Sequence, residues 1–261
     1  NIYGTLCQSE GRWSDALTAR QKGMATQTPY NSHLLHEIGR LFWQSGRYEL
    51  AKESLGRITA SGPNSHYFPG RYWHATWLLD FANLYIAWQQ PEQALFYSQL
   101  ARDNASKLGR KVLFACACKA EGTAQLQLEQ WREAKENLTH AFLLFQQEAS
   151  THHECSALTQ LIYLHLTLEE EAEITSYAEQ IWQLLNSGRF DMTIVEPIKA
   201  WWACYLAFRA LGDNRADRAL YAAYKTFQTQ LSHIYDQTWQ EDFSSQIPEH
   251  RDLLRAVKEL A

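Results

Sequence analysis

The sequence predicts an all-α protein built as a solenoid of helical hairpins. Apolar residues recur with helical spacing, and no stretch alternates polar and apolar residues over the length of a strand. Turn signals near residues 11, 46, 90, 130, 170 and 212 are separated by 35 to 44 residues, which is a typical period of helical repeats. Only 12 glycines and 6 prolines occur among 261 residues, few for a chain rich in tight turns.

Residues 32–65 form the clearest predicted hairpin. Each of its two helices carries an apolar stripe with helical spacing. The stripes are Leu35, Ile38, Gly39 and Phe42, followed by Tyr48, Ala51, Leu55 and Ile58. Gly46 separates the two helices, and small Gly39 and Ala51 would let them cross closely. This order of large, glycine, aromatic and alanine positions resembles the tetratricopeptide repeat, and the resemblance implies a right-handed α-solenoid.

The same pattern predicts the neighbouring hairpins. In the first hairpin, the spacing from Gly4 to Ala16 repeats that of the second, displaced by 35 residues. The third hairpin turns in QQPEQ at 89–93, where Pro91 suits the first turn of a helix. The fourth turns in LEQW at 128–131 without a glycine.

The C-terminal part continues the array. The fifth hairpin turns in the acidic run 169–173, the sixth turns at Gly212, and a closing helix follows Pro248. We therefore expect one repeat domain, with hairpins at about 1–28, 32–65, 75–108, 115–148, 155–187 and 197–232 and a closing helix at 249–260. Each hairpin should bury its apolar faces only against its neighbours in the array. The chain opens at Asn1 in the middle of this pattern, which indicates a fragment of a larger protein.

Composition limits the classes of partner. The net charge is −5 and no run of lysine and arginine occurs, so the sequence predicts no direct nucleic-acid partner. No window of 18 apolar residues and no signal-peptide pattern is present, and we expect no membrane association. The five cysteines are odd in number and occupy apolar helical positions, which favours reduced thiols and a cytoplasmic location.

The last third of the chain carries a more specific pattern. It consists of Pro197, Cys204-Tyr205, Gly212-Asp213, Arg215-Ala216, Leu220, Ile234, Asp236, Phe243, Ile247-Pro248-Glu249-His250-Arg251 and Leu253-Leu254. These residues resemble the C-terminal repeat region of bacterial STAND-type signalling ATPases and their adenylate-cyclase-linked relatives. Glu241 and Ser244 depart from that pattern, where an arginine and a leucine are usual. No phosphate-loop motif GxxxxGK[ST] occurs, so the resemblance places any nucleotide chemistry on a segment outside this chain.

The sequence offers weak candidates for chemistry. The run HHEC at 152–155 places adjacent histidines about 100° apart on a helix, which does not suit one metal ion. Cys116 and Cys118 should face opposite sides of a helix, one of them in the core. The acidic run 169–173 lacks the ligand pattern of an EF-hand and suits a solvated turn. Trp202 should be the exposed member of an aromatic stretch otherwise in the core. We expect no catalytic residue, no metal and no cofactor.

The repeat register gives a better candidate site. In such arrays the first helix of each hairpin lines the concave face. The inward positions of the second and third hairpins that we select as a binding groove are His33, His36, Arg40, Trp43, Gln44, Asn83 and Ile86. A surface that carries two histidines, an arginine and an unburied Trp43 favours recognition, because arginine and tryptophan are frequent at the centres of interfaces. The alternative is that these are ordinary solvated residues, with Trp43 half-buried between hairpins.

The predicted function is a non-catalytic sensor or scaffold module of a multidomain bacterial signalling regulator. Its partner would be a protein or peptide, or other domains of the same polypeptide, and self-association is compatible with the pattern. The alternative is a small-molecule inducer sensor, which a deep closed pocket would favour over an open trough. An enzyme remains a third class, which no motif supports.

Overall fold

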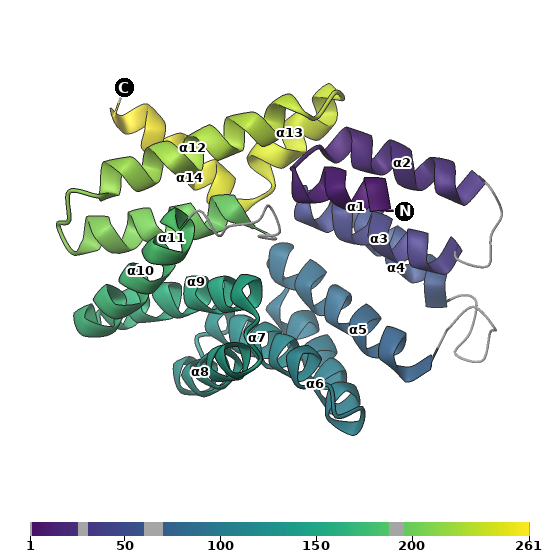
Figure 1. Ribbon diagram of the computed structural model, residues 1–261, viewed down its shortest axis with the longest axis horizontal. Coiled ribbons are helices and arrows are strands. Elements are labelled where there is room, and N and C mark those ends of the chain that lie inside the picture. The colour runs from purple at the N-terminus through teal and green to yellow at the C-terminus, as the bar shows by residue number, and fades with distance from the viewer. Residues whose placement is uncertain (1, 26–30, 60–69, 188–195, 261) are drawn as a thin grey trace.

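The computed structural model describes residues 2–25, 31–59, 70–187 and 196–260. These residues form fourteen helices and no strand, which confirms the all-α solenoid (Figure 1). The helices are α1 (Ile2–Ser9), α2 (Trp13–Ala25), α3 (Asn31–Gln44), α4 (Tyr48–Thr59), α5 (Gly70–Ala87), α6 (Pro91–Lys107), α7 (Lys111–Gln127), α8 (Trp131–Gln147), α9 (Thr151–Leu168), α10 (Glu171–Asn186), α11 (Pro197–Ala210), α12 (Ala216–Ser232), α13 (Gln237–Ser245) and α14 (Pro248–Leu260).

The helices pair in sequence order, and each pair packs on the next. The third and fourth pairs begin at Gly70 and Lys111, earlier than residues 75 and 115, because α5 and α7 extend into segments expected to be linkers. An additional helix, α13, precedes the closing helix and packs against it. The backbone is left-handed at a residue other than glycine after the first helices α5, α7 and α9, at Gln89, Glu129 and Glu169, and after the second helix α8, at Ala149. These turns therefore keep the repeat geometry without the glycine signal.

The hairpin crossing predicted at Gly39 is present. A Cβ atom added at Gly39 would lie 2.7 Å from side-chain atoms of Leu55, so only glycine permits this approach between α3 and α4. Gly122 has the same role between α7 and α8, where an added Cβ would lie 2.8 Å from the Leu138 side chain. In two hairpins, a glycine at the equivalent position thus allows the paired helices to pack closely.

We expect Ala51→Leu to lower the free energy of unfolding by about 1–3 kcal/mol, because the fully buried Ala51 faces α3 next to Gly39 and the site has no room for a larger side chain. Denaturant unfolding measures the effect. Glu53→Leu, on the exposed side of α4, is the control and should change stability by less than about 0.5 kcal/mol. Lys52 is unsuitable as a control because its ammonium lies 5.6 Å from the centre of the Trp88 ring. Equal losses for both variants would contradict the close crossing.

The solenoid closes on itself, so the expectation that hairpins pack only against sequence neighbours is wrong. The C-terminal end of α12 and helix α13 lie beside α1 and α2 in Figure 1. We call this contact the seam. Its apolar part pairs Trp13 with Phe243 and Phe42 with Trp239, each with ring centroids 6.2 Å apart. Its polar part includes an ion pair of 3.5 Å between Arg47 and Asp242.

Backbone atoms also meet across the seam. A Cβ atom at Gly46 would lie 2.9 Å from the Asp242 carbonyl oxygen, and one at Gly11 would lie 2.5 Å from the Gln230 side chain. Tyr235 donates its backbone N–H to the Ser14 hydroxyl at 3.0 Å. The turn glycines of the first two hairpins therefore have two roles. They end α1 and α3, and their lack of a side chain lets the C-terminal helices approach closely.

Two details of core placement differ from expectation. Trp202 is buried, whereas Trp201 is half-buried and packs edge-on against Trp182. Cys116 and Cys118 are both buried, because α7 is covered on several sides by neighbouring helices. All five cysteines are buried with free thiols. No described helix is long and apolar enough to cross a membrane.

Candidate functional site

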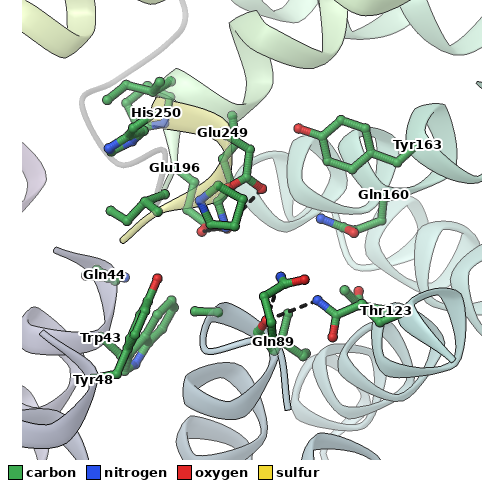
Figure 2. Close-up of a pocket in the computed structure, with 18 of the residues that line it drawn as sticks. Trp43, Gln44, Tyr48, Gln89, Thr123, Gln160, Tyr163, Glu196, Glu249 and His250 are labelled. Atoms are coloured by element: carbon green, nitrogen blue, oxygen red, sulfur yellow. Dashed lines mark hydrogen bonds and ion pairs between the residues drawn. The ribbon is translucent and has the colours of Figure 1, made fainter. Parts of the chain in front are cut away.

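The closed solenoid, which we call the ring, surrounds two adjoining cavities. The wide cavity measures about 810 Å³ and is lined mainly by the first helices of the pairs, α3, α5, α7, α9 and α11. The narrow cavity measures about 220 Å³ and is completed by α12 and α14 (Figure 2). Both are bordered by Trp43, Ile86, Ala87, Thr123, Gln160, Glu196 and Lys199. The C-terminal helices thus turn one end of the concave face into a pocket.

The predicted groove residues divide between these cavities. The wide cavity is lined by His36, Arg40, Trp43, Asn83 and Ile86, and the narrow cavity by Trp43, Gln44 and Ile86. His33 lines neither; its ring is exposed and packs edge-on against Trp73, with centroids 4.8 Å apart. Their role in binding stays a prediction.

Two of these residues are less available than predicted. His36 and Trp43 are only 6% and 7% exposed, and Trp43 belongs to the hydrophobic core, so the expectation of an unburied Trp43 is wrong. Gln44 is engaged by the Gln8 side-chain amide. Arg40 keeps 35% of its side-chain surface exposed, although its guanidinium also pairs with Glu37, and Asn83 is half-buried.

A buried charge network explains the position of His36. Its Nε2 atom lies 2.5 Å from the Asp80 carboxylate, which Arg40 also approaches at 3.8 Å. Burial alone would lower the pKa of His36, but the Asp80 carboxylate outweighs burial and raises the pKa to about 9. The imidazolium is therefore charged at neutral pH. Glu37 extends the network by contacting Arg40 at 3.5 Å and Arg20 at 3.2 Å.

A second charged cluster lies between the two cavities. Lys199 contacts Glu196 at 2.7 Å and Glu249 at 3.5 Å. Burial opposes the charge on Lys199, but the two carboxylates outweigh it and raise the pKa of the ammonium group. In Figure 2 the Tyr163 hydroxyl and the Gln160 amide point toward the cavity that Glu249 borders. This cluster joins α11 to α14 and fixes the closing helix against the ring.

The wall formed by α7 and α9 carries further charges that the sequence reasoning missed. Lys119 donates to the Ser156 hydroxyl at 2.9 Å. Lys111 is paired with Glu148 at 3.1 Å. Burial and the Lys119 charge lower the pKa of His152, so its ring is neutral at pH 7. Extending the inward register from the second and third hairpins to the fourth and fifth would have found these positions.

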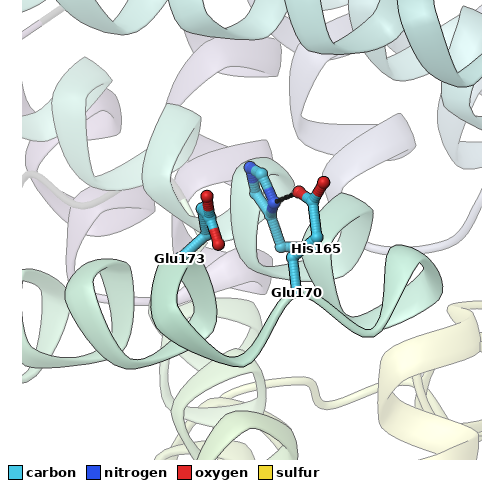
Figure 3. A group of neighbouring side chains, drawn as sticks. All are labelled: His165, Glu170 and Glu173. Atoms are coloured by element: carbon cyan, nitrogen blue, oxygen red, sulfur yellow. Dashed lines mark hydrogen bonds and ion pairs between the residues drawn. The ribbon is translucent and has the colours of Figure 1, made fainter.

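The histidine pair of the run 152–155 and the acidic run 169–173 take part in ring packing and ion pairing. The rings of His152 and His153 lie against each other with centroids 3.7 Å apart. Within the described chain, one group has ligand atoms close enough to hold a metal ion, formed by His165, Glu170 and Glu173 (Figure 3). Lys135 already places its ammonium 2.9 Å from the Glu170 carboxylate, which His165 also contacts. One of the two carboxylates of this group is therefore already paired with a lysine.

Comparisons with known proteins support the fold. No family model and no curated protein matches this sequence. Among solved structures, BtubC (BKLC) from P. vanneervenii is 13% identical, with a TM-score of 0.55 over 86% of this chain and 91% of that chain. A variant of the putative kinesin light chain repeats of Podosopora anserina, described as nearly identical TPR-like repeats, is 16% identical, with a TM-score of 0.50 over 78% of this chain and 96% of that chain. The fold is therefore that of a TPR-like helical-repeat protein.

Proposed function

We propose that this chain is a non-catalytic interaction module that binds a protein segment in the central cavity. TPR-like repeats generally mediate protein–protein interaction. The observation that carries the proposal is the wide cavity of about 810 Å³ on the concave face, where Arg40, Asn83 and Ile86 are only partly buried. An extended peptide suits such a surface, because first helices from successive hairpins offer side chains along its length.

The wider context of the proposal is a regulatory domain of a multidomain bacterial signalling protein of the STAND type, working in the cytoplasm. Residues of the C-terminal pattern support it by holding α13 and α14 in place. Asp236 accepts a hydrogen bond from the backbone N–H of Trp239 at 2.7 Å and so caps α13. The His250 ring contacts the Phe243 carbonyl oxygen at 2.8 Å and links the two helices. The residues of the pattern thus pack the C-terminal helices together, a role that they would keep in related proteins whose repeats close in the same way.

A second candidate function is the sensing of a small molecule, and the closed seam favours it. An open solenoid would offer a trough, whereas here α14 and α11 form a wall of the narrow cavity opposite Trp43 and Tyr48 (Figure 2). A cavity of about 220 Å³ suits a small ligand rather than a folded partner. A ligand there would touch helices on both sides of the seam and would favour the closed ring.

The test is selection from a displayed random peptide library, followed by affinity measurements on the chosen peptides. Arg40→Ala combined with Asn83→Ala should weaken binding by about 2 kcal/mol with unchanged helix content by circular dichroism. The control is Arg57→Ala combined with Asn214→Ala, two exposed positions outside both cavities, and should bind as the wild type does. Trp43 is left intact because it is core. Equal affinities for both double variants would refute binding in the wide cavity.

A further inference from the structure

The wide cavity carries an excess of positive charge in a protein whose net charge is −5. Six cationic groups line it, if His36 with its pKa of about 9 is included, against four carboxylates. The cations are Arg40, Arg110, Lys111, Lys119, Lys199 and His36, and the carboxylates are Glu37, Asp80, Glu148 and Glu196. The first turns of α7 and α9 lie at the same wall and add the partial positive charge of helix N-termini. An anionic group is therefore favoured there over a cationic one.

Most of these cations already have a carboxylate within ion-pair distance. Lys111 is paired with Glu148, Lys199 with Glu196, and Arg40 with Glu37. Lys119 and Arg110 differ: among the described residues, no carboxylate lies within 4.0 Å of either. Arg110 stands over the Tyr72 ring at 5.9 Å and is exposed. Lys119 is half-buried deeper along α7.

The surroundings of Lys119 provide hydrogen-bond donors. Its ammonium donates to the Ser156 hydroxyl, which leaves the hydroxyl proton available to another acceptor. His152 lines the same wall as a neutral ring, and a neutral imidazole carries one N–H. The Glu196 carboxylate, which is paired with Lys199, interacts with the Lys119 charge only from beyond 4.0 Å. A half-buried ammonium without an ion-pair partner in contact is costly, and a ligand carboxylate would offset that cost with charge-assisted hydrogen bonds.

From this geometry we propose that Lys119, with Ser156 and His152, forms a carboxylate-binding subsite in the wall of the wide cavity. The carboxylate belongs either to an acidic side chain of a bound peptide or to a small organic acid. Arg110 lies nine residues from Lys119, about 13 Å along α7, and offers a second cation at the cavity mouth. A peptide with two acidic groups could reach both cations, whereas a small dicarboxylate would occupy the Lys119 position alone. The subsite does not depend on peptide binding being the function of the cavity.

The experiment titrates the full chain with glutarate and with glutaramide, its uncharged near-isostere, by isothermal calorimetry. Glutarate should bind at least tenfold more tightly than glutaramide. Lys119→Met should weaken glutarate binding at least tenfold, while Lys111→Met, which removes the same charge from the same helix where it is already paired, should change it less than twofold. A blocked tripeptide, Gly-Glu-Gly, and its Gly-Gln-Gly counterpart form the peptide arm.

Each outcome decides the proposal. If the glutamate peptide binds more tightly than glutarate, and this binding is lost in Lys119→Met, the carboxylate belongs to a peptide. If glutarate binds more tightly than the peptide, and this binding is lost in Lys119→Met, the carboxylate belongs to a small organic acid. Equal binding of charged and uncharged probes, equal losses in both lysine variants, or no binding at 10 mM probe would overturn it. Failure of the Arg40 and Asn83 variants to affect selected peptides would refute the proposed peptide groove and leave the Lys119 subsite standing.

Discussion

Phe243→Ala is expected to lower the free energy of unfolding by about 3–5 kcal/mol, because a fully buried aromatic ring at the seam would be replaced by a cavity. Phe243 lies on α13 and packs its ring 5.6 Å from Phe227 and 4.4 Å from His250. It also faces Trp13 of the first hairpin. The variant should therefore weaken both the C-terminal core and the closure of the ring.

Hydrogen exchange separates these two effects. Exchange should rise first in α1 to α4 and α12 to α14, while α7 and α8, remote from the seam, should keep their protection. Tyr221→Ala is the control, because this aromatic side chain on α12 is 68% exposed and its removal should cost less than about 0.5 kcal/mol. A loss for Phe243→Ala as small as that of the control, or a uniform rise of exchange along the chain, would show that the seam adds no stability of its own.

Asp80→Asn is expected to destabilise the fold by about 3–5 kcal/mol, because it removes the closest counterion of the buried His36 imidazolium, at 2.5 Å, and leaves only Glu37 at 3.7 Å. The substitution keeps the size of the side chain, so the effect isolates charge. Asp217→Asn, at an exposed position on α12, is the matched control and should change stability by less than about 0.5 kcal/mol. Denaturant unfolding at pH 7 measures both.

The pH dependence of stability tests the same network. The pKa of His36 is about 9 in the folded protein against an ordinary value of 6.5. Because the folded-state pKa is raised, its contribution is fully present below about pH 6.5 and is lost as the pH rises through 9; the shift corresponds to about 3 kcal/mol as an order of magnitude. In Asp80→Asn this loss should disappear. A wild-type stability that stays flat from pH 6.5 to 9 would contradict the charged His36–Asp80 pair.

The local architecture follows from the sequence because it depends on residues close together in the chain. Helical periodicity predicted the all-α solenoid, and the small residue at Gly39 predicted a crossing that brings α3 within contact of Leu55. Where the glycine signal is missing, as at Glu129, the surrounding helix pair still imposes the left-handed turn. Such hairpins are specified by contacts between residues fewer than about 40 positions apart.

The candidate site could be predicted only in part, because its walls come from hairpins distant in the sequence. Register predicted that Arg40, Asn83 and Ile86 face inward, and all three line the wide cavity, while their role in binding stays a prediction. It could not show that Asp80 would pair with His36, because these residues belong to different hairpins and meet only when the hairpins have the right relative rotation. It also missed Lys119, whose position matters only once α9 supplies Ser156.

What tertiary structure alone decided is the closed ring. Each hairpin is rotated slightly relative to the one before, and the accumulated rotation brings α13 back to α3. Residues more than 190 positions apart, such as Trp239 and Phe42, then bury each other. Helical spacing determines which side chains share a face, but the total rotation along the array cannot be calculated from that spacing. For that reason the sequence determined the hairpins and their inward residues, whereas the seam, the narrow cavity and the burial of Trp43 arose only from the assembled array.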